Sequence, residues 1–285
     1  MSRIHDALKK AELEQGAEVD PARLNHGRAV ELPPISDPNA PTFAAPFTFE
    51  GLLKRCPQEQ WLPDTSTMLF FGSGNVQGQE AFRTLRSRLF QVREKRPLKS
   101  ILVAGATGDE GKSFVAANLA QVLVQQHGQR ALLIDADLRQ PKLHAVLGTS
   151  PMPGLTDYLM GNCEEFAILR RGPMENLFFV PAGRTVMNPL ELIAGPRMGV
   201  LMSQMEPAFD WIIVNSSPAV EVSDAGQLAN NCDGVLLVVR SEVTPYDWAQ
   251  KARDEFYRDK IVGVVLNGVD AKSLPQPGND RRLSN

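Results

Sequence analysis

A glycine-bearing loop followed by Lys112 and Ser113 holds the residues of this chain best suited to phosphate chemistry. An apolar, β-capable run (residues 101–104) precedes the loop, and a helical pattern follows it from residue 114 to residue 124. Backbone N–H groups of such a loop turn inward around phosphate oxygens, and the helix directs its positive end at them. The lysine would reach the β- and γ-phosphates, and the serine hydroxyl would contact Mg²⁺. The pattern therefore predicts an ATP–Mg²⁺ site.

The loop departs at one place from the usual spacing G-x-x-x-x-G-K-[ST]. Ala106 occupies the first glycine position, and Gly105 lies one residue early. The alternative interpretation is a glycine-rich turn that happens to precede Lys-Ser. The strand and helix on either side favour the nucleotide site, whose candidate residues are Thr107, Gly108, Asp109, Glu110, Gly111, Lys112, Ser113 and Phe114.

Two carboxylates follow a second apolar run. Asp135 and Asp137 end the sequence Ala-Leu-Leu-Ile-Asp-Ala-Asp that starts at residue 131. Carboxylates at the carboxyl end of a parallel strand can hold a hydrated Mg²⁺ or accept a proton from an attacking hydroxyl. We therefore expect Lys112, Asp135 and Asp137 to be catalytic, and Ser113 with the two carboxylates to contact the metal. The structural alternative is that Asp135 caps the loop and Asp137 is solvated.

Regular alternation of strands and helices indicates how these residues are positioned. Several strands are continuous apolar runs, which is typical of a parallel sheet covered on both faces. The pattern predicts a doubly wound α/β domain, which binds ligands at the carboxyl ends of its strands. The expected strands are 100–104, 131–135, 177–181, 211–215, 234–239 and 261–266, and the expected helices are 78–93, 112–126, around 154–160, 188–205, 223–231 and 245–257.

The N-terminal quarter has a different composition. Residues 2–16 place apolar side chains at helical spacing, which predicts an amphipathic helix within residues 1–28 that either docks on a partner or frays. Seven prolines lie between residues 30 and 64, so residues 29–74 are predicted to be a linker without regular structure. The P-loop domain is expected over 75–270, followed by a flexible tail over 271–285.

The composition excludes several classes of function. The net charge of −3 and the sequence pI of about 5.9 provide no general attraction to nucleic acid. Three scattered cysteines and four scattered histidines form no zinc motif and suggest reduced thiols. No apolar run is long enough to span a bilayer, and the first residues lack the apolar core of a signal peptide. These features predict a cytoplasmic protein.

The chain resembles the bacterial tyrosine kinases (BY-kinases) of capsule and exopolysaccharide systems, which are P-loop proteins related to the MinD/ParA ATPases. The resemblance covers residues 75–270. Besides the P-loop, it rests on Leu-Leu-Ile-Asp-Ala-Asp-Leu-Arg-Gln-Pro at 132–141, Val-Pro-Ala-Gly-Arg at 180–184 and Asn-Pro-Leu-Glu-Leu at 188–192. The first nine residues also resemble members from exopolysaccharide gene clusters.

The resemblance implies roles for two further sets of residues. Glu80, Arg83 and Arg86 match the family's oligomerisation motif E-x-x-R-x-x-R, which implies a ring-shaped homo-oligomer. The alternatives for this helix are surface ion pairs of little energetic weight or a basic face. Asn267, in Gly-Val-Val-Leu-Asn-Gly-Val, matches the segment that contacts the nucleotide base.

Two departures from the family weaken the expected kinase activity. Its Walker B strand normally ends in Asp followed by Thr-Pro-Pro, whereas this chain has Asn215 before Ser-Ser-Pro. An amide loses the negative charge that Mg²⁺ prefers in a ligand. Residues 271–285 contain no tyrosine, so the tail phosphorylation of active members is absent there. The tyrosines are Tyr158, Tyr246 and Tyr257, each within a predicted helix.

Three functions follow from these observations. The first is an ATP-binding BY-kinase homologue with weakened activity that regulates exopolysaccharide or capsule biosynthesis or export. The second is an active kinase of other proteins, and the third is a MinD/ParA-like positioning ATPase. Thr107, where such ATPases carry a signature lysine, argues against the third. The resemblance implies a membrane-embedded co-polymerase or chain-length partner, and through it a peripheral location at the inner membrane.

Overall fold

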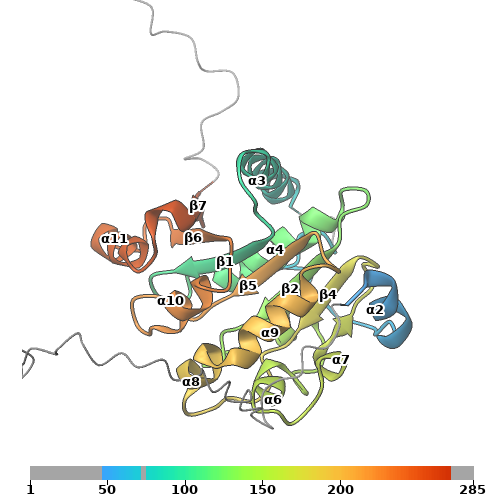
Figure 1. Ribbon diagram of the computed structural model, residues 1–285. Coiled ribbons are helices and arrows are strands. Elements are labelled where there is room, and N and C mark those ends of the chain that lie inside the picture. Colours follow the sequence, from blue (N-terminus) through green and yellow to red (C-terminus); the bar gives the residue numbers. More distant parts are fainter. Residues whose placement is uncertain (1–46, 72–74, 271–285) are drawn as a thin grey trace, which may run out of the picture. The chain divides into compact units, whose positions relative to one another are not determined.

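The computed structural model describes residues 47–71 and 75–270, which form a seven-stranded sheet with helices on both faces (Figure 1). The strand order is β3-β4-β2-β5-β1-β6-β7, and every neighbouring pair is parallel except β3 with β4. This arrangement confirms the predicted doubly wound α/β class. The strands are β1 (Ser100–Gly105), β2 (Ala131–Asp135), β3 (Arg170–Arg171), β4 (Leu177–Val180), β5 (Trp211–Asn215), β6 (Gly234–Arg240) and β7 (Ile261–Asn267).

The apolar runs of the central strands are buried on both sides. Every residue of β1, β2, β4 and β5 is buried, as expected for strands covered by helices on both faces. One face packs against α3 (Val76–Lys95), α4 (Lys112–Val124) and α5 (Leu143–Leu147). The other face packs mainly against α2 (Phe49–Arg55), α6 (Leu155–Leu159), α7 (Glu165–Ile168), α8 (Pro189–Ala194), α9 (Pro196–Met205), α10 (Asp224–Ala229) and α11 (Tyr246–Asp254).

The prediction of an unstructured linker over residues 29–74 is wrong for residues 47–71. Thr48 caps α2 by accepting a hydrogen bond from the Gly51 backbone N–H, and Leu52 is fully buried beneath that helix. Trp61 and Met68 are also buried and pack on the opposite face of the sheet. The prolines of this segment lie outside the short helix, so they did not prevent its formation. Its apolar side chains determine the structure.

A buried amide in α4 holds part of this segment in place. Asn118 Oδ1 accepts a hydrogen bond of 2.9 Å from the Leu69 backbone N–H, and Asn118 Nδ2 donates to the Thr67 carbonyl at 3.0 Å. Asn118 is fully buried. A buried polar side chain needs such partners, and here they attach residues 67–69 to the helix that follows the P-loop.

The remaining helices differ from prediction mainly at their ends. The helix expected over 188–205 is two helices, α8 and α9, divided at Gly195, because Pro196 has no N–H to continue a helix and instead starts the next one. The helix expected over 245–257 ends at Asp254, so Tyr257 lies outside α11. The short elements α5, α7 and β3 were not predicted. The proposed N-terminal helix and the tail after residue 270 lie outside the described residues.

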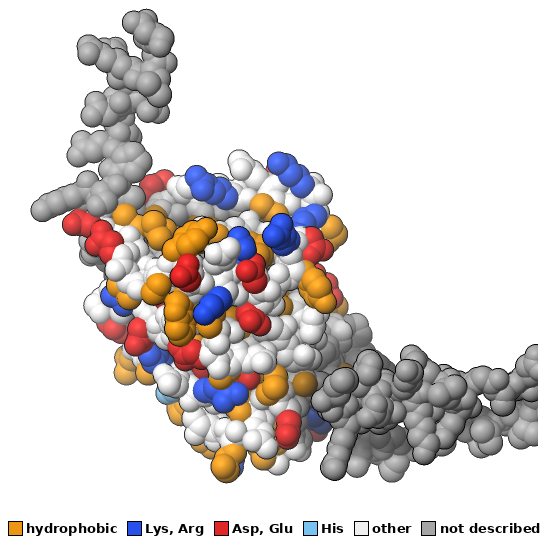
Figure 2. Space-filling model, turned by 90° about the vertical axis from the view of Figure 1, so that its left-hand side faces the viewer, with side chains coloured by type: hydrophobic (Ala, Val, Ile, Leu, Met, Phe, Trp, Pro, Cys, Tyr) orange, Lys and Arg blue, Asp and Glu red, His pale blue; other side chains and the backbone are white. Residues whose placement is uncertain are grey.

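The sheet edge formed by β7 is more exposed than its apolar sequence suggested. Val264 and Leu266 are 62% and 56% exposed, and Tyr246 at the start of the neighbouring α11 is 77% exposed. Figure 2 shows the face that carries α11, where hydrophobic side chains are interspersed with charged ones. Within the described ranges, no helix is both long and apolar enough to cross a bilayer.

Candidate nucleotide-binding site

The register of the parallel strands brings the predicted site residues together at the carboxyl ends of the strands. Asp135 at the end of β2 lies directly opposite Asn215 at the end of β5, and Asn215 in turn lies opposite Val103 of β1. The P-loop leaves the same end of β1, so its lysine and serine face the ends of these two strands. Three segments that are far apart in the sequence thus form one site, as the doubly wound architecture predicts.

Two glycines allow the backbone of the loop to adopt its shape. Gly111 has a φ of 94°, a left-handed conformation that disfavours other residues, and a Cβ there would lie 2.0 Å from Asn267 Nδ2. At Gly105 a Cβ would lie 2.3 Å from the Glu110 carboxylate and 2.8 Å from the Val238 carbonyl. Gly105, one residue before the usual glycine position, therefore permits the close approach of Glu110 and Val238 to the backbone. Ala106 occupies a position that tolerates a methyl group.

Glu110 points into the protein and supports the loop from behind. Its side chain is buried, and one carboxylate oxygen accepts a 3.1 Å hydrogen bond from the Thr107 backbone N–H. The other accepts a 2.7 Å hydrogen bond from Thr244 Oγ1, in the segment between β6 and α11. Asn267 Nδ2 donates to the Glu110 carbonyl at 2.9 Å. Glu110 therefore shapes the loop, and its side chain faces away from the pocket.

A pocket of about 390 Å³ opens over the loop. Lys112 lies in this pocket with its Nζ donating to the Thr107 carbonyl, and burial lowers the pKa of Lys112 below its usual range. A buried cation beside loop amides is suited to an anionic ligand such as a phosphate. The residues lining the pocket are Gly108, Asp109, Gly111, Lys112, Ser113, Asp137, Gln140, Lys142, Pro218 and Arg240.

Asn215 is bonded to the residues predicted to contact metal. Its Nδ2 donates to Asp135 Oδ1 at 3.0 Å and to Ser113 Oγ at 3.3 Å. Asp135 is fully buried and also accepts hydrogen bonds from the backbone N–H groups of Asp137 and Leu143. Burial raises the pKa of Asp135 to about 7, although the bond from Asn215 opposes the shift. Asp135 therefore also caps the loop that follows β2, as the structural alternative predicted.

Of the two aspartates that follow the β2 run, Asp137 is the one that lines the pocket. Its Oδ1 accepts a 2.8 Å hydrogen bond from Ser217 Oγ and a 3.1 Å hydrogen bond from the Gln140 backbone N–H. The neighbouring Arg139 forms a two-point ion pair with the fully buried Asp224 of α10, at 2.7 and 3.0 Å. Asp137 is therefore held firmly and is not simply solvated.

The oxygen atoms around Ser113 fit a magnesium ion that also binds phosphate. Asn215 Oδ1 is buried and has no hydrogen-bond partner in the structure, so one amide oxygen remains available beside Ser113 Oγ and Asp135. Among the described residues no group of three His, Cys, Asp or Glu side chains could hold a metal. Magnesium commonly takes only one or two protein carboxylates and completes its shell with water and substrate phosphates. The donor set is therefore compatible with a nucleotide-bound Mg²⁺.

Other predicted residues lie away from the pocket or have partners within the fold. The Phe114 side chain packs against Phe82 of α3, with ring centroids 5.8 Å apart. In α3, Arg83 pairs with Glu80 at 3.1 Å, and both side chains are exposed. Arg86 Nη1 donates to the Val122 carbonyl near the end of α4 at 2.9 Å. Arg86 thus has an intramolecular role whatever α3 does between chains.

Sequence reasoning missed four residues that shape the site. Lys142 and Arg240 line the pocket, Ser217 holds Asp137, and the Gly108 backbone N–H donates to Glu221 Oε1 at 3.4 Å. Lys142 and Arg240 both contact Asp109, from positions 33 and 131 residues away in the sequence. The only available signal was the position of Ser217 just after β5 and of Arg240 at the end of β6, since ligands of such sheets bind at the strand ends.

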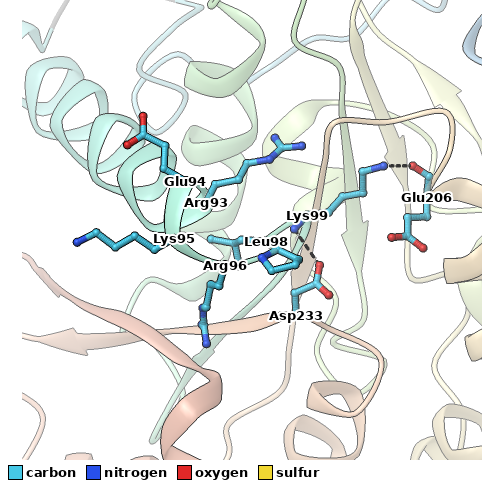
Figure 3. Close-up of a pocket in the computed structure, with 9 residues that line it drawn as sticks. Arg93, Glu94, Lys95, Arg96, Leu98, Lys99, Glu206 and Asp233 are labelled. Carbon is cyan, nitrogen blue, oxygen red and sulfur yellow. Dashed lines mark hydrogen bonds between the residues drawn. The ribbon is translucent and has the colours of Figure 1, made fainter.

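A second cavity, of about 520 Å³, opens at the amino ends of the strands, between the end of α3 and the start of β1 (Figure 3). Basic and acidic side chains line it together. Lys99 Nζ donates to the Glu206 carbonyl at 2.6 Å, and the Asp233 carboxylate accepts the backbone N–H groups of Lys99 and Ser100. This larger cavity lies at the amino ends of the strands, whereas ligands of such sheets bind at the carboxyl ends, where the P-loop pocket lies.

Comparison with known proteins agrees with the geometry. The family model of the CobQ/CobB/MinD/ParA nucleotide binding domain matches residues 101–281. The tyrosine-protein kinase YwqD of Bacillus subtilis is 34% identical over 191 residues, which cover 66% of this chain and 80% of YwqD. The chain belongs to the bacterial tyrosine kinases. The resemblance predicted from the motifs is confirmed, and the domain is a nucleotide-binding domain of P-loop fold.

Two further relatives extend the comparison. The kinase domain of the Escherichia coli tyrosine kinase ETK superposes with a TM-score of 0.65 at 30% identity, covering 69% of this chain and 78% of that domain. The succinoglycan biosynthesis transport protein ExoP of Rhizobium meliloti is 34% identical over 205 residues, which cover 68% of this chain. The chain spans only 25% of the length of ExoP.

Proposed function

We propose that this chain binds ATP with Mg²⁺ and regulates exopolysaccharide or capsule biosynthesis or export, with phosphoryl transfer weakened by Asn215. One observation carries the proposal: Asn215 Nδ2 points at Asp135 and Ser113, in the position where the family has a carboxylate. The P-loop and Lys112 remain intact, so nucleotide binding is expected to survive better than chemistry. Loss of one interaction at a catalytic site commonly lowers the rate by about a hundredfold or more.

The chain's own residues have distinct roles in this proposal. The loop amides from Gly108 to Ser113 and the Lys112 ammonium hold the phosphates. A bound Mg²⁺ would neutralise charge that develops on the transferred phosphoryl group. Asp137 lines the pocket and is the carboxylate placed to accept the proton of an attacking hydroxyl, while Asp135 lies behind it and orients Ser113 through Asn215.

A second function, that of an active kinase of other proteins, is favoured by one observation. Asp137 lines the pocket together with Lys112 and is held by Ser217, so a carboxylate is available there to accept the proton of a substrate hydroxyl. Two tyrosines, Tyr246 and Tyr257, are more than 75% exposed, whereas Tyr158 is buried. Tyr246 and Tyr257 would therefore be the accessible targets if the kinase phosphorylated its own chain within the described residues. The third function, a positioning ATPase, has no observation of its own in its favour.

The decisive assay measures ATP hydrolysis and tyrosine phosphorylation of the full chain and three variants. Lys112→Met is expected to abolish both activities, because it removes the phosphate-binding cation. Asn215→Asp is expected to raise the rate by about a hundredfold, because it restores the carboxylate. Asn162→Asp adds the same charge at an exposed position outside the pocket and should change nothing. Robust wild-type phosphorylation with no gain in Asn215→Asp would show that the amide does not limit the chemistry.

The partners proposed for this function rest on the relatives. ExoP is described as a transport protein of succinoglycan biosynthesis and is about four times the length of the part that matches here. We therefore infer that the chain acts with a membrane-embedded co-polymerase or chain-length protein, at the inner face of the membrane and as a ring-shaped homo-oligomer. Co-purification with such a membrane protein, lost on removal of residues 1–30, would support docking through the predicted N-terminal helix.

A further inference from the structure

Two cations besides Lys112 line the pocket, and both contact the loop residue Asp109. Lys142 Nζ lies 2.9 Å from Asp109 Oδ1, and Arg240 Nη1 donates to the Asp109 carbonyl at 2.9 Å. Lys142 follows β2 in the chain and Arg240 ends β6, so the two cations reach the loop from different strands. Asp109 is thus held from two sides at the pocket.

Asp109 has an unusual conformation for a residue with a side chain. Its φ is 56°, in the left-handed region that glycine favours and that Asn and Asp tolerate better than most residues. The side chain is 82% exposed, and its contact with Lys142 holds the pKa of the carboxyl below its usual range. An ionised carboxylate therefore lies in the phosphate-binding loop, where it would repel a bound phosphate.

The two cations have different neighbours. Lys142 directly precedes Leu143, whose backbone N–H donates to Asp135 Oδ2 at 3.2 Å, so Lys142 comes from the segment that contacts a proposed metal ligand. The Arg240 side chain lies beside Gly268, next to Asn267, where the aliphatic Cγ of Arg240 is 3.6 Å from the position of a Cβ. The metal end of a P-loop site holds the terminal phosphates. Lys142 is therefore the cation nearer the group that distinguishes ATP from ADP.

We propose that Lys142 discriminates ATP from ADP by exchanging the Asp109 carboxylate for the terminal phosphate. The inference rests on the proposed nucleotide binding at this pocket. The Lys142–Asp109 pair is exposed on both sides, and such pairs contribute little to stability, so exchange of partners is easy. A terminal phosphate carries more negative charge than a carboxylate and offers three acceptor oxygens. Asp109 then acts as an internal competitor that weakens ATP binding.

The competing interpretation is that the pair only stabilises the loop. In that case replacing Lys142 would disturb the loop and weaken ATP and ADP equally, because both nucleotides use the same loop amides. The ratio of the two dissociation constants separates the interpretations. A purely structural role leaves this ratio unchanged, and a contact with the terminal phosphate changes it.

The experiment measures the dissociation constants of Mg–ATP and Mg–ADP by isothermal titration on the full chain. Lys142→Met is expected to lower the preference for ATP about three- to tenfold, and Lys142→Arg should largely retain it. Asp109→Asn keeps a residue that tolerates positive φ but removes the charge, and should tighten ATP binding about three- to tenfold. In the double variant the gain from Asp109→Asn should be smaller than in the wild-type background, because only the repulsion is relieved and no Lys142 is present to bind the phosphate.

Controls separate failure of this inference from failure of the proposed function. Lys54→Met, which removes an exposed lysine of α2 outside the pocket, should leave both constants unchanged. If wild type binds neither nucleotide, the proposed function fails. If it binds both and Lys142→Met leaves the ATP:ADP ratio unchanged, the inference about Lys142 is overturned. An unchanged unfolding midpoint in each variant shows that the measured differences arise at the pocket.

Discussion

At Asn215 a single substitution of oxygen by nitrogen changes the charge of the site. The amide donates to both Asp135 and Ser113 and brings no negative charge of its own. A carboxylate at position 215 would place two negative charges within hydrogen-bond distance of each other, which raises the pKa of such a pair unless a cation lies between them. The amide thus makes the metal-free site tolerable and weakens its attraction for Mg²⁺.

Removing the carboxyl of Asp135 should change how stability depends on pH. The folded-state pKa of about 7 lies above the usual value of 3.8, because burial disfavours the charged form. Between about pH 4 and pH 7 the folded chain retains a proton that the unfolded chain has lost, so stability falls as the pH rises through this window. The slope from this group is at most about 1.4 kcal/mol per pH unit. In urea unfolding without Mg²⁺, the Asp135→Asn variant should lack this fall of stability between about pH 4 and pH 7.

The comparison for this prediction is the exposed Asp254 in α11, whose replacement by Asn should leave the pH profile as in wild type. Parallel profiles for wild type and Asp135→Asn would show that Asp135 is already ionised at pH 5.

The residues of the site were predictable from sequence where chemistry and spacing coincide. Lys112, Ser113 and both aspartates of the second motif were found because a P-loop and a strand-end carboxylate are local patterns. Lys142 and Arg240 were missed because their contacts with Asp109 depend on how separate strands pack. The inward turn of Glu110 follows from its contact with Thr244, which no local pattern indicates.

At the scale of elements, α4 links the nucleotide loop to residues 67–69, which precede α3 in the chain. Asn118 →Ala removes the acceptor for the Leu69 backbone N–H and the donor for the Thr67 carbonyl. A buried group left without a partner costs about 1–3 kcal/mol, so the free energy of unfolding in urea should fall by that amount. Trp61, which is buried against Phe179, should report the release as a change in fluorescence.

The exposed Asn162→Ala is the matched control and should leave both signals unchanged. Full retention of stability in Asn118→Ala would mean that apolar packing alone holds residues 64–71.

Elements were predictable where apolar runs are long and were missed where they are short. All six predicted strands occur. The apolar runs of β1, β2, β4 and β5 are buried on both faces, and β7 forms at the edge although Val264 and Leu266 are exposed. The helix α2 was missed since its seven residues lie among prolines, and its burial depends on Phe178 and Phe209, far away in the sequence. The antiparallel β3 has only two residues, too few for a pattern.

For the whole molecule, the proposed ring depends on the exposed part of α3. Arg83→Glu places a negative charge beside Glu80 and removes the cation of the motif, so assembly should be lost. Light scattering after gel filtration should then give a mass near that of one chain, 31.3 kDa. Arg86 is unsuitable for this test because its loss would also remove the bond to Val122.

Arg253→Glu reverses the same charge in α11 and should leave the mass of the assembly unchanged. The ring interpretation of α3 is contradicted if wild type and Arg83→Glu have equal masses above that of a single chain.

The position of β7 has a consequence for how the nucleotide loop is supported. Within the described part of the chain β7 pairs only with β6, whereas the P-loop follows the fully buried β1. Edge strands with few buried contacts open at a lower free energy than central ones, and their amide hydrogens exchange sooner. Asn267 ends β7 and donates to the Glu110 carbonyl, so local opening of this strand should release the loop from its outer support while β1 stays folded.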